Sequence, residues 1–97
     1  MEFVHIVLAK PNLETTPAAM EAVIAKVGAL QNVIPGIIGF EKGQDVGGNN
    51  QGYTYGFVVT FDNEEHFNAY GPHPAHQVVA KEILSISDLI SFDYPRA

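Results

Sequence analysis

The side chains of residues 52–61 alternate with the period of a β-strand, which leaves few folds open to the chain. Large side chains recur at every second position: Tyr53, Tyr55, Phe57, Val59 and Phe61. Positions of one parity share one face of a strand, so these five side chains lie together. Such a row forms a protein core, a contact with a second chain or the wall of a ligand pocket. The pattern therefore predicts a strand that is covered on at least this face.

Three further segments, residues 2–9, 37–44 and 88–94, also have strand character. The first is rich in β-branched and aromatic residues and is apolar on both faces apart from its first residue and His5. A strand with two apolar faces is covered on both sides. We therefore expect something to pack on each side of the sheet that contains it.

Helix starts are marked by residues that cap the N-terminal turn. Thr16 precedes Pro17, and His73 precedes Pro74; proline suits the first helical position because its fixed φ is helical and its missing N–H would have no partner there. Asp62 has Glu65 three residues later, which is the spacing of a capping box. The sequence predicts helices after each of these three caps, the last ending near residue 86.

The predicted order is strand, helix, strand, strand, helix, helix, strand, over one domain spanning residues 1–97. This is the α+β, ferredoxin-like β-α-β-β-α-β arrangement, a four-stranded antiparallel sheet with helices on one face. The other sheet face would stay uncovered although its side chains are apolar. We therefore expect a homodimer in which two such faces meet and close a dimeric α+β barrel.

The composition excludes several classes of function. Five basic and eleven acidic residues give a formal charge of −6, without a basic stripe, so nucleic acid and anionic membranes are poor partners. The chain has no cysteine, which excludes disulfides and thiolate metal sites. No signal-peptide layout and no membrane-length apolar run is present, and we expect a cytoplasmic protein.

The side chains best suited to acid–base chemistry lie in the stretch 70–76, where Tyr70, His73 and His76 occur within seven residues. With Pro74 as the first helical residue, His76 lies in the first turn, where free N–H groups and the helix dipole disfavour an imidazolium. A neutral imidazole beside a phenol is suited to proton transfer at a carbonyl compound. The pair is also open to a structural interpretation, in which Tyr70 and His76 hold the loop to the sheet.

Several separated landmarks resemble those of the stress-responsive dimeric α/β-barrel (Dabb) family, over essentially the whole chain. They are His5, the run 34–36 (Ile-Pro-Gly), the pair 52–53 (Gly-Tyr), Tyr70 with the run 73–76 (His-Pro-Ala-His), and the run 92–94 (Phe-Asp-Tyr). The resemblance implies the dimeric barrel fold. Among members of this family that are polyketide cyclases, it implies a cofactor-free intramolecular aldol reaction.

The resemblance places the roles of general base and proton donor on His76 and Tyr70. It offers Asp93 as the group that fixes the His76 tautomer, and His5 as a further side chain of the same cavity. A pairing of Asp93 with a backbone amide or with Arg96 is the alternative. The implied substrate-binding residues are Ile24, Val27, Tyr55, Phe57, His73, Val79, Leu89 and Ser91. Tyr55 and Val27 replace a histidine and a tyrosine of the cyclases, which implies a different substrate.

Three functions remain open at this point. The first is a cofactor-free cyclase or isomerase that acts on a β-dicarbonyl or polyketide-like compound. The second is a non-catalytic stress-responsive protein whose cavity binds an apolar small molecule. The third, based on fold analogy, is a cofactor-free monooxygenase. His73 and His76 lie three residues apart but lack a third ligand, so we expect no metal and no cofactor.

Overall fold

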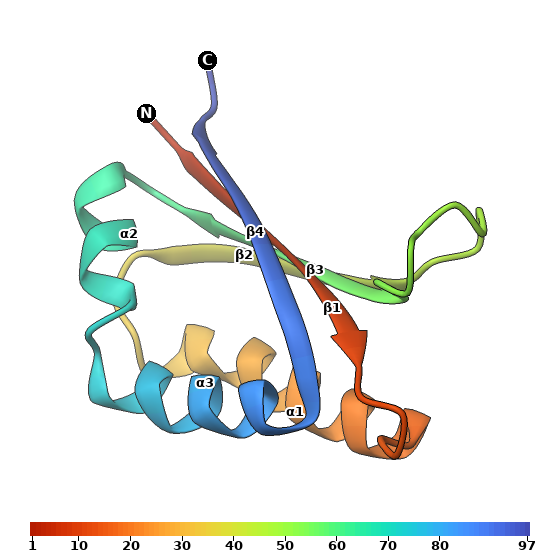
Figure 1. Cartoon of the computed structure of the whole chain (residues 1–97). Helices are drawn as coiled ribbons and strands as arrows, with labels where there is room; N and C mark the ends of the chain where they lie inside the picture. The colour runs from red at the N-terminus through yellow and green to blue at the C-terminus, as the bar shows by residue number, and fades with distance from the viewer.

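The computed structural model describes all residues from 1 to 97 and contains one four-stranded antiparallel sheet. The strands are β1 (Phe3–Pro11), β2 (Ile37–Gln44), β3 (Tyr55–Phe61) and β4 (Ser87–Pro95), and they lie in the order β2-β3-β1-β4 (Figure 1). Both ends of the chain belong to neighbouring strands, and the Arg96 N–H donates to the Glu2 carbonyl at 2.8 Å. The predicted ferredoxin-like topology is confirmed.

The helices lie on one side of this sheet. They are α1 (Pro17–Ala29), which continues into a short 3-10 turn (Leu30–Asn32), α2 (Glu64–Tyr70) and α3 (Pro74–Ile86). In Figure 1, α1 and α3 lie under the sheet and α2 covers one end of it. Two caps are as predicted: the Thr16 hydroxyl accepts from the Ala19 N–H at 3.2 Å, and His73 Nδ1 accepts from the Ala75 N–H at 3.1 Å.

Alternate residues of the strands supply the core between sheet and helices. On β3, Phe57, Val59 and Phe61 are buried, each at 5% exposure or less, and the face they share with Tyr55 meets the helices. From α1, Met20 and its neighbours one turn apart fill the opposite side. The row of large side chains in residues 52–61 is therefore core for most of its length.

Two local expectations are wrong in detail. Asn63, and not Asp62, is the N-cap of α2, and its side-chain oxygen accepts from the His66 N–H at 2.9 Å. Strand β3 begins at Tyr55 because Gln51 and Gly52 have positive φ (54° and 94°), which keeps the preceding residues in the loop.

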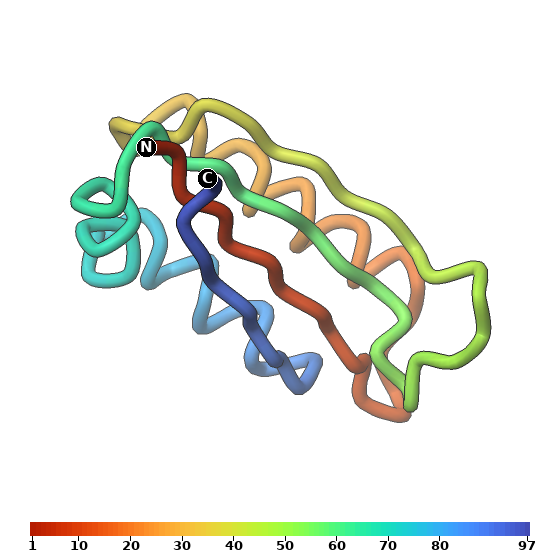
Figure 2. Tube along the Cα trace, turned by 90° about the horizontal axis from the view of Figure 1, so that it is seen from above, coloured from red at the N-terminus to blue at the C-terminus, as the bar shows by residue number.

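The other sheet face has no helix over it, as Figure 2 shows in the view from above. Several large apolar side chains on this open face are exposed, among them Leu8 (39%), Ile90 (48%) and Phe92 (67%). They alternate along β1 and β4 with residues that face the helices. No helix of the chain has the length and apolar character needed to cross a membrane.

Candidate active site

Tyr70 and His76 lie in contact where α2 ends and α3 begins. Tyr70 is the last residue of α2, and His76 lies in the first turn of α3. Their ring centroids are 4.2 Å apart with 48° between the ring planes. The intervening turn is closed by the His73 N–H, which donates to the Tyr70 carbonyl at 3.1 Å. The local sequence therefore brings the phenol and the imidazole together without a long-range contact.

The hydrogen bond of His76 defines which ring nitrogen is available. His76 Nδ1 lies 3.0 Å from the carbonyl oxygen of Gly71. A carbonyl only accepts, so Nδ1 carries the proton, and in the neutral ring Nε2 keeps its lone pair. Burial lowers the pKa of His76 below its usual value, and the charges of His5 and His73 lower it further. The hydrogen bond to the Gly71 carbonyl raises the pKa but does not outweigh these effects. His76 is therefore a neutral base with Nε2 as its basic atom.

Tyr70 is 3% exposed and is held by aromatic neighbours. The Phe61 ring meets it edge-on at 5.0 Å between centroids. Burial raises the pKa of Tyr70 to about 12, so the phenol stays protonated at neutral pH. Its hydroxyl makes no hydrogen bond with the protein. No fully buried side-chain polar atom of the chain lacks a partner, so this hydroxyl is accessible. The hydroxyl is thus a free donor at the edge of the buried ring.

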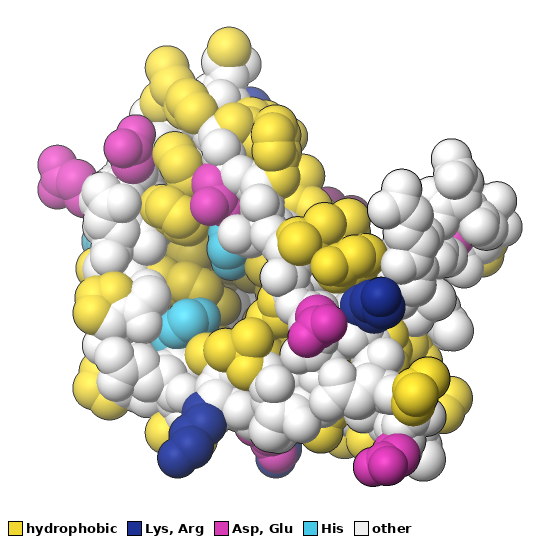
Figure 3. Space-filling view, in the orientation of Figure 1, with side chains coloured by type: hydrophobic (Ala, Val, Ile, Leu, Met, Phe, Trp, Pro, Cys, Tyr) yellow, Lys and Arg dark blue, Asp and Glu magenta, His cyan; other side chains and the backbone are white.

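His5 and Asp93 form a second polar pair beside Tyr70. The two residues are partners across β1 and β4, and His5 Nδ1 bonds the Asp93 carboxylate. The His5 ring lies 5.9 Å from the Tyr70 ring between centroids. Figure 3 shows histidine side chains at a hollow between β4 and the helices α2 and α3. The site therefore combines groups from both ends of the chain.

The orientation of His76 differs from the sequence-based expectation. Asp93 was expected to fix the His76 tautomer, but it bonds His5, and the Gly71 carbonyl holds His76. Arg96, the alternative partner of Asp93, bonds Glu2 at 2.7 Å. The reason is the strand register, which sets Asp93 directly opposite His5.

The expected substrate-binding residues fall into separate groups. Five are buried side chains of the core: Ile24, Val27, Tyr55, Phe57 and Val79. His73 caps α3 through its Nδ1. Leu89 and Ser91 are on the same face of β4 as Asp93, and Ser91 is exposed there. The structure therefore does not gather the expected substrate-binding residues at one site.

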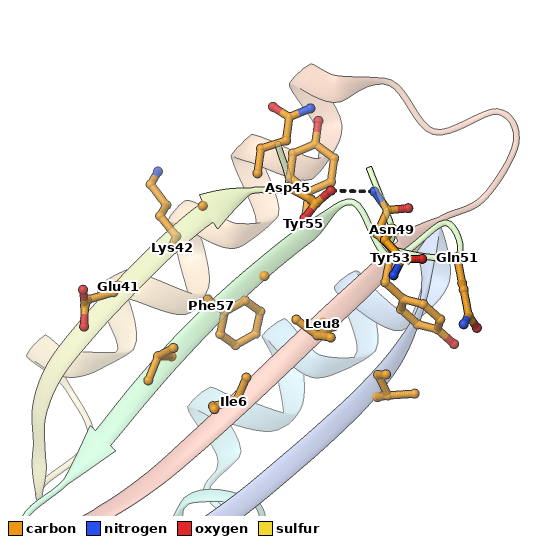
Figure 4. Close-up of a pocket in the computed structure, with 16 residues that line it drawn as sticks. Ile6, Leu8, Glu41, Lys42, Asp45, Asn49, Gln51, Tyr53, Tyr55 and Phe57 are labelled. Atoms are coloured by element: carbon orange, nitrogen blue, oxygen red, sulfur yellow. Dashed lines mark hydrogen bonds between the residues drawn. The ribbon is translucent and has the colours of Figure 1, made fainter. Parts of the chain in front are cut away.

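A separate hollow lies on the open face of the sheet. It has a volume of about 650 Å³ and contains neither Tyr70 nor His76. Figure 4 shows Ile6 and Leu8 over its middle, with the loop of residues 45–52 at one end. A smaller hollow of about 170 Å³ lies between α1 and the end of β2, where Ile24 and Tyr55 contribute to its wall. Sequence reasoning missed the large groove, whose floor depends on two glycines being paired across strands, Gly43 and Gly56.

No group of three or more histidine, aspartate or glutamate side chains is placed to hold a metal ion. The Nδ1 atom of His73 is engaged in the helix cap, where it accepts from the Ala75 N–H at 3.1 Å. The chemistry available at the site is that of a neutral imidazole, a phenol and a histidine–carboxylate pair.

The chain matches one protein family over nearly its whole length. Residues 3–96 match the model of the stress responsive A/B barrel domain, and the chain belongs to that family. The stress-response A/B barrel domain-containing protein HS1 of Arabidopsis thaliana is 34% identical over 93 residues, covering 93% of this chain and 85% of that protein. Olivetolic acid cyclase of Cannabis sativa is 33% identical, also over 93 residues, covering 93% of this chain and 92% of the cyclase.

Solved structures give the same assignment of the fold. The Arabidopsis thaliana protein At3g17210 superposes with a TM-score of 0.90 at 32% identity, covering 98% of this chain and 95% of that chain. A dimeric ferredoxin-like protein of unknown function from Jannaschia sp. CCS1 has a TM-score of 0.85 at 23% identity, covering 99% and 100%. The hydroxynitrile lyase of Passiflora edulis has a TM-score of 0.87 at 23% identity, covering 96% and 91%. Proteins of different function therefore share this fold, and the fold alone does not define a reaction.

Proposed function

We propose that this chain is a cofactor-independent cyclase or isomerase that moves a proton on a β-dicarbonyl or polyketide-like compound. The observation that carries the proposal is the Tyr70–His76 contact, 4.2 Å between ring centroids, with His76 Nδ1 bonded to the Gly71 carbonyl. This arrangement leaves an imidazole with a free Nε2 in contact with a phenol ring. The similarity to a protein named as a cyclase supports the same class of chemistry.

His76 acts as the general base in this proposal. A carbon between two carbonyl groups has an acidic proton, and His76 Nε2 can accept it because the ring is neutral. Tyr70 donates its hydroxyl proton to the carbonyl oxygen on which negative charge develops. The high pKa of Tyr70 suits a donor that stays protonated until the substrate oxygen becomes basic. The resulting enol carbon attacks a second carbonyl of the same molecule and closes a ring. The enol proton then returns to Tyr70, and the proton held by His76 passes to the new alkoxide oxygen.

His5 and Asp93 have a positioning role in this scheme. Asp93 fixes the His5 ring through Nδ1, so that Nε2 of His5 is the atom left for a polar group of the ligand. Leu89 and Ser91 lie on the same face of β4 and would form one wall of the ligand site. Ile24, Val27, Tyr55, Phe57 and Val79 shape the layer beneath, and His73 sets the direction of α3.

We also propose that the chain is a homodimer. Its open sheet face exposes large apolar side chains of β1 and β4, which isolated monomers rarely do over a contiguous area. The Jannaschia neighbour of the same fold is described as dimeric. The second subunit would cover the open face and leave the Tyr70–His76 side accessible.

The test uses β-polyketo acids and their thioesters as probes, with thermal shift for binding and mass spectrometry for products. The informative variant is His76→Asn, because an asparagine amide can still donate to the Gly71 carbonyl but has no basic nitrogen. His76→Asn and Tyr70→Phe should each lower the rate by roughly 10²- to 10⁴-fold while ligand binding persists. Tyr53→Phe, which removes a phenol hydroxyl outside the site, should leave the rate unchanged.

Two results would reject the enzyme. If the parent binds these compounds and never converts them, the chain is a ligand-binding protein. If His76→Asn and Tyr70→Phe convert the probes as fast as the parent, the reaction takes place without these two residues.

A further inference from the structure

The hollow of about 170 Å³ at the end of β2 lies on the helix side of the sheet. The strand register pairs Lys42 with Phe57 and Gln44 with Tyr55. Residues paired in this way share one face of the sheet, and the face of Tyr55 and Phe57 meets the helices. The side chains of Lys42 and Gln44 therefore project to the α1 side. We call this space the α1–β2 hollow, and a second subunit on the open face would leave it accessible.

Two opposite charges line the α1–β2 hollow from its two walls. Glu21 belongs to the wall formed by α1, and Lys42 belongs to the wall formed by β2. Neither residue takes part in any ion pair of the chain, so their charged atoms lie more than 4.0 Å apart. The hollow therefore separates a carboxylate from an ammonium group, and each lacks a charged partner.

A third polar group in the wall is the hydroxyl of Tyr55. The residue is only 7% exposed, and its hydroxyl makes no hydrogen bond with the protein. No fully buried side-chain polar atom of the chain lacks a partner, so this hydroxyl is accessible. Figure 4 shows Tyr55 and Lys42 near the end of β2, with α1 passing behind them. A phenol at this place can donate a hydrogen bond to a carboxylate.

The free edge of β2 adds main-chain groups beside the hollow. The Asp45 N–H donates to the Thr54 carbonyl at 2.9 Å. Bonded and non-bonded pairs alternate along an antiparallel ladder, so the N–H and C=O groups of Lys42 and Gln44 point away from β3. No further strand pairs with β2 on that side. These donors and acceptors are available to a ligand.

The back of the hollow is apolar, and its volume limits the size of a ligand. Ile24 lines it and is 2% exposed, while Gly43 contributes no side chain. An apolar cavity of about 150 Å³ holds benzene, so a hollow of this size accommodates a small molecule and not a nucleotide or a folded peptide. The ligand is therefore of the size of a single small metabolite.

The arrangement of charges selects a ligand that carries both signs. An anion attracted by Lys42 is repelled by Glu21, and a cation experiences the reverse. A neutral molecule gains nothing from either charge. A molecule with an ammonium group and a carboxylate at separate positions is attracted by both walls. The Ile24 surface favours an aliphatic substituent on the same molecule.

We propose that the α1–β2 hollow binds a free α-amino acid with an aliphatic side chain. The ammonium group of the ligand lies at Glu21, its carboxylate at Lys42 and the Tyr55 hydroxyl, and its side chain on Ile24. The site is separate from the Tyr70–His76 contact. Its occupancy does not depend on the reaction proposed above.

Nuclear magnetic resonance titration of the full chain with L-leucine tests this site. The amide signals of residues 21–24 and 42–44 should shift and saturate. A ligand of about nine non-hydrogen atoms at ordinary ligand efficiency gives a dissociation constant of roughly 1 to 10 mM. N-acetylleucine lacks the ammonium group and leucinamide lacks the carboxylate. Each should bind about 3- to 10-fold more weakly, because each loses one charged hydrogen bond at a partly exposed site.

Variants show whether each end of leucine meets the expected residue. Glu21→Gln should weaken leucine about 3- to 10-fold and leave N-acetylleucine unchanged, because that ligand has no ammonium group to lose. Lys42→Gln should do the same for leucine and leucinamide. The matched controls are Glu41→Gln, on the other face of β2, and Lys81→Gln, on α3. Both remove the same charges elsewhere and should leave leucine binding unchanged.

Several results would overturn this site. The absence of saturable shifts at leucine concentrations well above the millimolar range shows that the hollow binds no amino acid. Equal losses in the control variants, or equal effects of Glu21→Gln on leucine and N-acetylleucine, show that only the net charge of the chain matters. If β-polyketo acids shift the same amide signals and leucine displaces them, the hollow belongs to the ligand of the Tyr70–His76 site. A chain that binds leucine but converts no β-polyketo compound keeps this site and loses the proposed enzyme.

Discussion

Replacing Gly36 by alanine should destabilise the chain strongly, and the structure gives two separate reasons. Gly36 has a φ of +91°, a conformation that costs a residue with a Cβ about 1 to 2 kcal/mol. In addition, the new Cβ would overlap Cβ and Cγ of His66 on α2. Overpacking of this kind costs about 1 to 3 kcal/mol. The sum is a loss of about 2 to 5 kcal/mol in the free energy of unfolding.

Urea denaturation at one fixed protein concentration measures this loss, since the stability of a dimer depends on concentration. The double variant Gly36→Ala with His66→Gly removes both overlapping atoms and leaves the backbone strain. Relative to His66→Gly alone, the second substitution should then cost only about 1 to 2 kcal/mol. If Gly36→Ala costs less than about 0.5 kcal/mol, or the same in both backgrounds, then the contact between Gly36 and His66 does not limit this turn.

Three further predictions concern other parts of the chain. Burial lowers the pKa of His76 below 6.5, so kcat/KM should be constant above pH 6.5 and should fall as the pH drops through the pKa of His76. A midpoint at or above pH 6.5 contradicts the role of His76 as the general base. The native state binds this proton less readily than the unfolded chain, so stability should also fall below pH 6.5, with a smaller slope in His76→Asn. Asp45 accepts from Asn50 and Gly48, so Asp45→Ala should speed proteolysis within residues 45–52, whereas Asn49→Ala should not; equal rates would refute this. Gly28→Val should cost about 1 to 3 kcal/mol in urea unfolding, because its Cβ would lie 2.8 Å from Phe40 Cε2, and a neutral effect would show that this ring moves freely.

The fold could be predicted from local signals that agree with one another. The pairs Thr16 with Pro17 and His73 with Pro74 define two helix starts by backbone geometry alone, and both caps are present. The choice between Asp62 and Asn63 as the third cap could not be predicted, because adjacent residues with equal capping ability differ only in the path of the chain before them. Asp62 instead contacts His66 Nδ1 at 2.5 Å.

The candidate site was predictable only where it is local. Tyr70 and His76 are six residues apart, and the turn between them determines that their rings meet. The hydrogen-bond partner of His76 is a backbone carbonyl, which every residue has, so the residue types in the sequence do not predict this hydrogen bond. The pairing of His5 with Asp93 depends on the register of two strands from opposite ends of the chain. A one-residue change in that register would place another side chain opposite His5.

The alternation of β4 carries a consequence for how this protein can change. Asp93 faces the helices and His5, while its two neighbours Phe92 and Tyr94 face the other side of the sheet. Deleting a single residue between 88 and 91 would turn the carboxylate outward and push an aromatic ring against the imidazole. Substitutions on the two faces can accumulate separately, but length changes cannot, because each one alters both surfaces at once. We therefore expect this strand to tolerate new side chains far better than insertions or deletions.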